Sequence, residues 1–174
     1  MPVTTPGADV TLSGSRMLLF TAPPDGAAGI RERYGYPTDV MQAMDNYNIF
    51  LPEGYDQDSL RYPVVYLFRG REREWANATE DGSRRGNIKT VADALYGRGA
   101  IGKMILVMPG MSESRTSAEY DYLTKELIPH IDGTVRTLPV RQKRGLDGFS
   151  YGGVDLLQLV RRNPELFFTA GSPR

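Results

Sequence analysis

The sequence predicts an α/β domain built around a mostly parallel β-sheet. Two short runs, residues 64–68 (VVYLF) and 104–108 (MILVM), are apolar throughout, as expected of strands that are buried on both faces. Apolar residues recur at helical spacing in residues 88–95 and 119–135. Strands that alternate with helices in this way are typical of an α/β fold with a parallel sheet.

Length and composition favour one soluble domain and exclude several functions. The chain has 174 residues, of which 40% are apolar and 24% are charged, enough for one well-formed core. The 21 basic and 21 acidic residues cancel, so the net charge does not indicate binding to nucleic acid or to a membrane surface. The absence of cysteine excludes disulfides and thiolate catalysis. We predict no cofactor and no metal ion.

The N-terminal part is expected to differ from the rest of the chain. Residues 1–45 are predicted to form a lead-in and loop with one edge strand near residues 17–20, and residues 46–174 to form part of the main domain. The N-terminus has no cationic start, so it does not resemble a signal peptide, and no apolar run reaches the length of a membrane-spanning helix. The location of the protein stays open.

The remaining elements follow from alternation, turns and helical periodicity. Residues 46–51 alternate polar and apolar side chains before a turn at Pro52. Helices are expected from Ile88 to a stop at Gly97, and over residues 119–135, where Pro129 should bend the helix. The strands predicted to share one sheet are residues 46–51, 64–68, 104–108, 143–147 and 166–169.

The most informative stretch is residues 144–162, RGLDGFSYGGVDLLQLVRR. It contains G-x-S-x-G with Ser150 at its centre, after a predicted strand and before residues with helical spacing. This context is that of a nucleophile elbow, a turn so sharp that glycine is needed two residues before and after the serine. We therefore predict that Ser150 attacks an acyl carbon and that the Tyr151 N–H helps to bind the oxyanion. The alternative is an ordinary glycine-rich loop.

Several further segments carry a family resemblance from about Asn46 onward. In chain order they are YNIFLPEGYD, RYPVVYLFRG, MILVMPG, YLTKELIPHID, GLDGFSYGG and NPELF. Together they resemble the Putative esterase family of α/β-hydrolases, which includes feruloyl and acetyl-xylan esterases, S-formylglutathione hydrolase, enterochelin esterase and mycolyltransferases. The resemblance implies an α/β-hydrolase-like three-layer sandwich and a serine carboxylic-ester hydrolase.

The resemblance also implies a second oxyanion donor. In the family this donor is the backbone N–H after the glycine of the turn that follows the strand at residues 64–68, here Arg71. Arg69 precedes that glycine, where many relatives have histidine or aspartate, and Arg71 and Arg73 lie close by. These arginines form either a solvated basic loop or a pocket mouth that favours an anionic substrate group.

The catalytic acid and histidine of the family pattern are missing. In this fold the order is Ser, then Asp or Glu, then His, on loops after later strands, but only one helix and the start of one strand follow Ser150. The sheet therefore looks truncated after the strand that follows this helix. The one histidine, His130, precedes Ser150 and is expected on a helix that covers the sheet. Asp147 and Asp155 are close to Ser150 in sequence, but an elbow directs such neighbours away, which favours structural or solvated roles.

Two functions from different classes remain open at this point. The first is an esterase that acts through an acyl-enzyme on Ser150, on a small-molecule or carbohydrate-linked ester, with its acid and base outside this sequence. Such a chain by itself should be nearly inactive. The second is a catalytically inactive interaction module that self-associates through its unfinished sheet edge.

Overall fold

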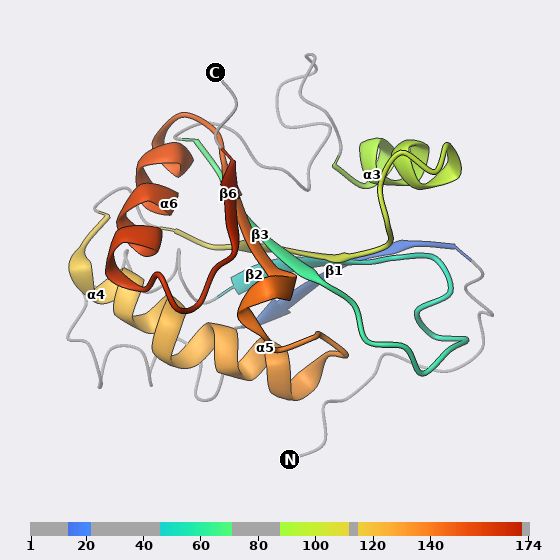
Figure 1. Cartoon of the computed structure of the whole chain (residues 1–174), viewed down its shortest axis with the longest axis horizontal. Helices are drawn as coiled ribbons and strands as arrows, with labels where there is room; N and C mark the ends of the chain where they lie inside the picture. The colour runs from blue at the N-terminus through green and yellow to red at the C-terminus, as the bar shows by residue number, and fades with distance from the viewer. Residues whose placement is uncertain (1–13, 22–45, 71–87, 112–114, 172–174) are drawn as a thin grey trace.

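The computed structural model describes residues 14–21, 46–70, 88–111 and 115–171 (Figure 1). Its strands form one six-stranded sheet in the order β1-β2-β4-β3-β5-β6. The pairs β3–β4, β3–β5 and β5–β6 are parallel, and the pairs β1–β2 and β2–β4 are antiparallel. The strands are β1 (Arg16–Thr21), β2 (Asn46–Leu51), β3 (Val64–Phe68), β4 (Ile105–Pro109), β5 (Arg144–Gly148) and β6 (Thr169–Gly171). The predicted α/β fold with a mostly parallel sheet is confirmed.

The predicted strands agree closely with the observed ones, with one clear shift. The bounds of β2 and β3 are as predicted, and β4 and β5 each begin one residue later. The strand near residues 17–20 exists as β1 at the edge of the described sheet, as expected, and it pairs antiparallel with β2. The last strand was predicted to begin at residue 166 but begins at Thr169, because Leu166 belongs to a turn in which its N–H bonds to the Asn163 carbonyl at 3.1 Å.

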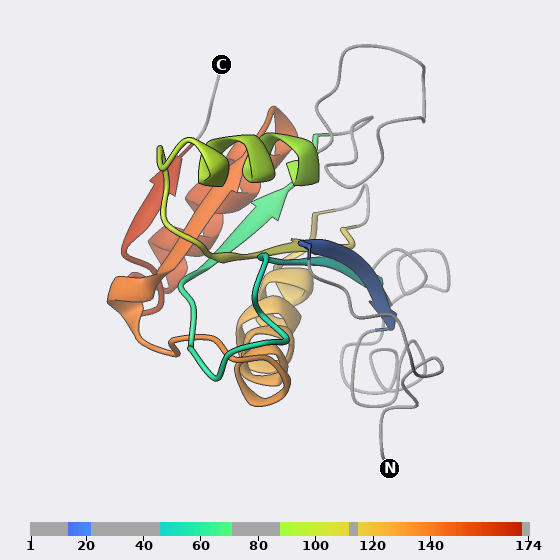
Figure 2. The same ribbon diagram turned by 90° about the vertical axis from the view of Figure 1, so that its right-hand side faces the viewer.

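Helices cover both faces of the sheet and complete three layers (Figure 2). On one face lies α3 (Ile88–Gly97), which packs with Phe50, Leu67 and Leu106. The other face carries α4 (Ser117–Tyr122), α5 (Ile128–Thr134) and α6 (Tyr151–Arg162), and the larger core lies between these helices and the sheet. A short 3₁₀ helix, η2 (Arg141–Lys143), leads into β5. In the described ranges, no helix is long and apolar enough to cross a membrane.

The helix predicted over residues 119–135 is continuous but changes its winding. Between α4 and α5 it forms a π-helical segment, η1 (Leu123–Leu127), and the Ile128 N–H bonds to the Leu123 carbonyl, five residues earlier. Pro129 follows in the first turn of α5. Proline removes one backbone donor and its ring collides with the carbonyl four residues earlier, and a π-turn is one way in which a helix accommodates such a break.

Candidate active site

The candidate active site is the turn between β5 and α6. Phe149 leaves β5, and its N–H donates to the Phe68 carbonyl of β3 at 3.2 Å. Ser150 then has φ 57° and ψ −117° and precedes the first residue of α6. Positive φ is strained for a residue with a side chain. Of the described non-glycine residues, Ser150 and Arg115 are the two that adopt it. The strand, turn and helix that the motif requires are thus present.

The glycines on either side of Ser150 make this turn sterically feasible. A Cβ atom on Gly148 would collide with the Gly152 carbonyl, and one on Gly152 would collide with the Phe68 carbonyl. The Gly152 N–H bonds to the Phe149 carbonyl at 2.9 Å, which closes the turn. The backbones of β3, β5 and α6 therefore meet at distances that exclude any side chain at either glycine.

The turn presents Ser150 to solvent at the N-terminus of α6. The Ser150 side chain is exposed and makes no capping hydrogen bond to the helix. Tyr151 begins α6, and the first backbone N–H groups of a helix have no partner within the helix. The Tyr151 N–H and the positive end of the helix dipole therefore lie next to the serine, where they favour negative charge.

The turn after β3 lies directly beside Ser150. A Cβ atom on Gly70 would stand 3.3 Å from Ser150 Cβ and 3.2 Å from the Phe149 carbonyl oxygen. This proximity follows from the pairing of β3 with β5, whose last residues, Phe68 and Gly148, are register partners. The two turns thus meet at the carboxyl edge of the sheet, where ligands bind in open parallel sheets. Arg71 and Arg73 lie outside the described residues.

Arg69 makes a contact that neither of the two alternatives for it included. Its side chain is partly buried, and Nη2 donates to the Met111 carbonyl at 3.0 Å. Met111 lies just after β4 and is itself fully buried. The guanidinium therefore ties the end of β3 to the end of β4, a structural role that a count of basic residues in the loop does not indicate.

Asp155 forms a buried polar cluster under α6. Its side chain is fully buried, Oδ1 accepts a hydrogen bond from the Tyr120 hydroxyl at 3.0 Å, and Oδ2 lies 3.2 Å from Arg115 Nε. Burial raises the pKa of Asp155 to about 6, against the opposing influence of Arg115 and Tyr120. The position of Asp155 in the apolar run VDLLQLV signals a buried carboxylate. The polar loop that contains Arg115 gave no comparable signal, so sequence reasoning missed this pair.

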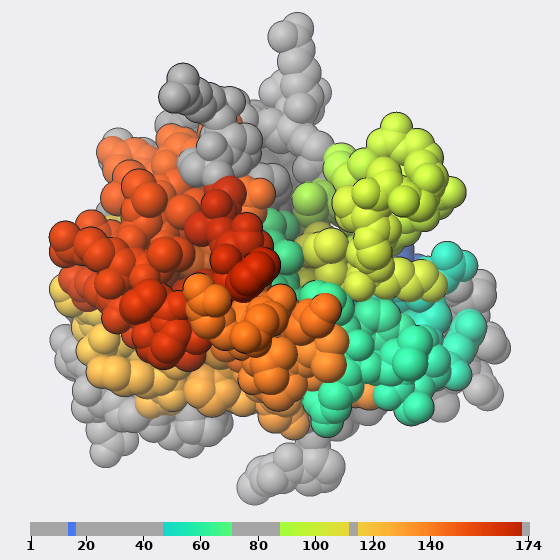
Figure 3. Space-filling view, viewed as in Figure 1, coloured from blue at the N-terminus to red at the C-terminus, as the bar shows by residue number. Residues whose placement is uncertain are grey.

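Asp147 lies on the other face of the sheet, in an apolar groove of about 260 Å³ between α3 and the strands. In the space-filling view, α3 is separated from the C-terminal elements α6 and β6 (Figure 3). Asp147 Oδ1 is buried and has no hydrogen-bond partner within the described part of the chain, and burial raises the pKa of this carboxyl. Asp147 therefore faces away from Ser150.

His130 lies on α5 and pairs with the sheet. Its Nε2 lies 3.3 Å from the hydroxyl of Tyr47, and the two rings meet edge to face. Burial lowers the pKa of this imidazole. Tyr47 belongs to β2, three strands across the sheet from β5, and neighbouring strands are about 4.8 Å apart. This histidine is therefore beyond hydrogen-bond reach of Ser150.

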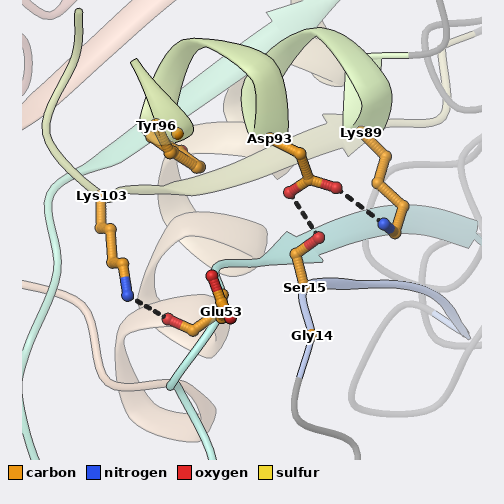
Figure 4. A pocket seen from close by; sticks show the side chains of 8 residues that line it. Gly14, Ser15, Glu53, Lys89, Asp93, Tyr96 and Lys103 are labelled. Atoms are coloured by element: carbon orange, nitrogen blue, oxygen red, sulfur yellow. Dashed lines mark hydrogen bonds and ion pairs between the residues drawn. The ribbon is translucent and has the colours of Figure 1, made fainter. Parts of the chain in front are cut away.

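A second hollow, of about 290 Å³, lies at the opposite edge of the sheet (Figure 4). The charged side chains of Lys89, Asp93 and Lys103 in this hollow have partners there. Asp93 accepts hydrogen bonds from Ser15 Oγ at 2.5 Å and from Lys89 Nζ at 2.8 Å, and Lys103 Nζ donates to the Glu53 carbonyl at 2.7 Å. In the described ranges, no group of three or more His, Cys, Asp or Glu side chains could hold a metal ion.

Comparison with known proteins agrees with this geometry. The family model described as "Putative esterase" matches residues 39–173. An endo-1,4-beta-xylanase/feruloyl esterase of Xylanibacter ruminicola is 30% identical over 138 residues, which are 71% of this chain and 18% of that protein. An esterase of Mycobacterium tuberculosis is 25% identical over 150 residues, which are 80% of this chain and 31% of that protein.

Solved structures show the same fold. A ferulic acid esterase superposes with a TM-score of 0.68 at 22% identity, over 90% of this chain and 58% of the other. The chain thus spans less than a third of the two curated relatives and just over half of this structure. The family model covers most of the sequence, including β2 to β6 and the Ser150 turn. The chain therefore belongs to the Putative esterase family of α/β-hydrolases.

Proposed function

We propose that the protein contributes the nucleophile and oxyanion hole of a serine carboxylic-ester hydrolase. The observation that carries this proposal is the backbone of Ser150, held at positive φ between two sterically required glycines and beside the turn at Gly70. A strained, exposed serine at a helix N-terminus is the arrangement that acyl transfer uses. Family membership supports the same reaction class.

The chemistry proceeds through an acyl-enzyme. Ser150 Oγ attacks the ester carbonyl carbon as its proton passes to a base, and the Tyr151 N–H stabilises the oxyanion. The Arg71 N–H is proposed as the second donor. Collapse of the tetrahedral intermediate expels the alcohol, which takes up the proton, and water then releases the carboxylic acid and regenerates the hydroxyl.

The base is proposed to come from polypeptide outside these 174 residues. A serine hydroxyl is a weak nucleophile without an adjacent base. The only histidine of the sequence is engaged with Tyr47, and Asp155 is engaged with Arg115 and Tyr120. A later aspartate and histidine, on strands that continue the sheet beyond β6, would complete the triad.

The substrate is proposed to be a small-molecule or carbohydrate-linked ester. Two structures that share the fold were solved with sinapinate and with ferulic acid, and a related sequence is named a feruloyl esterase. Methyl ferulate and methyl sinapinate are therefore suitable test substrates, together with p-nitrophenyl acetate as an unspecific ester.

Ester hydrolysis by two polypeptides tests the proposal. The 174-residue chain should hydrolyse p-nitrophenyl acetate scarcely above background, and Ser150→Ala should change this little, because a triad without its base retains only residual activity. A longer polypeptide that continues through the later strands should be at least about a hundredfold faster, and Ser150→Ala should abolish that gain. Robust Ser150-dependent turnover by the short chain would contradict the external base.

The second candidate is an interaction module that self-associates through β6. This strand ends the described sheet, Thr169 and Ala170 are exposed, and Leu157 and Phe168 nearby are 66% and 61% exposed. An open edge can pair with another strand. Sedimentation should then show a dimer that Ala170→Pro disrupts, since proline removes an edge donor. A monomer at all concentrations would count against this function.

A further inference from the structure

The cluster around Asp155 joins three segments that surround Ser150. Asp155 lies on α6, one turn after the Ser150 turn, and is fully buried. Arg115 precedes α4 and has 13% of its side chain exposed. The Asp155 carboxylate and the Arg115 guanidinium are 3.2 Å apart and largely shielded from solvent. The loss of either would leave the other as an uncompensated buried charge.

Arg115 also reaches the turn after β3. While Nε faces Asp155, Nη2 donates a long hydrogen bond of 3.5 Å to the Arg69 carbonyl. The Arg69 side chain in turn donates to the Met111 carbonyl at the end of β4. One guanidinium therefore connects the helix that follows Ser150 with the turn that contains Gly70.

The position of that carbonyl matters for the geometry beside Ser150. The Arg69 oxygen belongs to the peptide group that joins Arg69 to Gly70. Because a peptide group is planar, holding its oxygen also fixes the direction of the Gly70 N–H. A Cβ atom placed on Gly70 would stand 3.3 Å from Ser150 Cβ. Gly70 therefore lies beside the serine, and a rotation of this peptide would alter the wall of the candidate oxyanion hole.

We propose that Arg115, with Asp155 as its counter-ion, is a positioning residue that holds the Arg69–Gly70 peptide in place beside Ser150. The importance of that peptide for catalysis rests on the proposed function. The strained backbone of Arg115, with φ 49°, fits a role in which the side chain must reach two fixed partners. Arg115 acts through the turn and is not itself expected to contact substrate.

This arrangement makes the turn sensitive to pH. The charged and titratable groups that face Asp155 are Arg115, Tyr120 and Glu119, from the start of α4 and the residues before it, and Arg69 from the turn after β3. As the pH falls through about 6, Asp155 becomes neutral, and Arg115 loses its charged partner. The Arg69–Gly70 peptide should then become less firmly held.

Nuclear magnetic resonance of the ¹⁵N-glycine-labelled 174-residue chain tests this directly and needs no catalytic activity. The Gly70 amide signal should shift with a midpoint near pH 6. Asp155→Asn should remove the titration. Arg115→Gln should also remove the titration of the Gly70 signal. Asp155 still ionises in this variant, but no guanidinium connects it to the Arg69 carbonyl. Tyr120→Phe should keep the titration and raise the midpoint, since the Tyr120 hydrogen bond lowers the pKa of Asp155.

Two controls test whether the Gly70 titration depends on Arg115 and Asp155 and not on another titrating group. His130→Gln removes another group with a shifted pKa and should leave the Gly70 titration unchanged. A Gly70 titration that persists in Arg115→Gln, or its absence in the wild-type chain, would overturn the proposal. In the longer polypeptide, Arg115→Gln should lower kcat with little change in KM. If no polypeptide shows Ser150-dependent hydrolysis, the proposed function fails while the Gly70 result stands.

Discussion

At the scale of single residues, the two glycines of the Ser150 turn should tolerate no side chain. Gly148→Ala and Gly152→Ala each place a methyl group against a carbonyl of the neighbouring backbone. Because backbone atoms cannot move aside easily, each variant should lose about 2 to 3 kcal/mol in the free energy of unfolding, measured by urea denaturation.

Gly133→Ala is the matched control. Gly133 lies in α5, its Cβ would meet nothing within 4 Å, and it does not need a positive φ. Alanine should therefore stabilise the helix by about 0.5 to 1 kcal/mol. If all three variants lost the same free energy of unfolding, the glycines at the Ser150 turn would have no special steric role.

Asp147 should make the fold less stable as the pH rises. Burial raises the pKa of this carboxyl, so the folded state binds the proton more tightly than the unfolded state. The stabilisation from protonation is complete below the unfolded pKa and is lost as the pH rises through the folded pKa. Asp147→Asn should thus match the wild type near pH 3 and exceed its melting temperature at pH 7.

Asp93 provides a control of opposite sign. Burial opposes its ionisation, but hydrogen bonds from Lys89 and Ser15 outweigh burial and lower its pKa. The contribution of ionised Asp93 to the free energy of unfolding is fully present above the unfolded pKa, and it is lost as the pH falls through the folded pKa. Asp93→Asn should therefore melt below the wild type at pH 7, and the difference should shrink in acid. Parallel pH profiles for both variants would contradict these assignments.

At the scale of elements, Asp132 should hold α5 to the sheet. Its Oδ2 lies 2.5 Å from Arg144 Nη2 at the start of β5, and its Oδ1 accepts from Thr137 Oγ1 at 2.6 Å. Arg144 is 5% exposed, so Asp132→Ala leaves a buried cation without its partner. The free energy of unfolding should fall by about 3 kcal/mol.

The exposed pair Asp121 and Lys125 gives the comparison for that variant. Asp121 Oδ2 and Lys125 Nζ are 3.0 Å apart and form an acid–base pair like that of Asp132 and Arg144. However, 48% of the Asp121 side chain and 66% of the Lys125 side chain are exposed. Asp121→Ala should cost at most about 0.5 kcal/mol. The difference between the two aspartates, measured under one set of conditions, isolates the contribution of burial.

The elements also show what local sequence could and could not predict. The bounds of β2 and β3 were correct because alternation, continuous apolar runs and the adjacent prolines are local signals. The π-helical segment before Pro129 was not predicted beyond a bend, since proline marks a break but not the way in which the helix absorbs it. β6 begins later than predicted because a hydrogen bond from the Leu166 N–H to the Asn163 carbonyl closes a turn before it. Local sequence did not indicate this backbone bond.

At the scale of the whole molecule, the sheet topology accounts for one part of the candidate site, and long-range side-chain contacts account for the rest. The adjacency of Gly70 and Ser150 was predictable because parallel strands bring their carboxyl ends to one edge, and β3 pairs with β5. The Arg115–Asp155 pair joins residues forty positions apart through side chains, and nothing in a single sequence indicates such a contact. The structural role of Arg69 depends in the same way on the buried end of β4.

The sheet order also predicts how stability is distributed over the molecule. β3 and β4 are paired on both sides, and Val64, Ile105 and Val107 have no exposed surface. β6 pairs only with β5 in the described sheet, and its first two residues are exposed. Because amides exchange through local as well as global opening, those of β6 should exchange at least about a hundredfold faster than those of β3 and β4.

Hydrogen exchange followed by mass spectrometry or NMR measures this gradient, and the longer polypeptide supplies the decisive comparison. If later strands continue the sheet beyond β6, their pairing should slow exchange in β6 towards that of β5 and leave β3 and β4 nearly unchanged. Equal protection of β6 in the two polypeptides would show that nothing pairs with this edge, and the proposal that the triad is completed by strands beyond β6 would then fail.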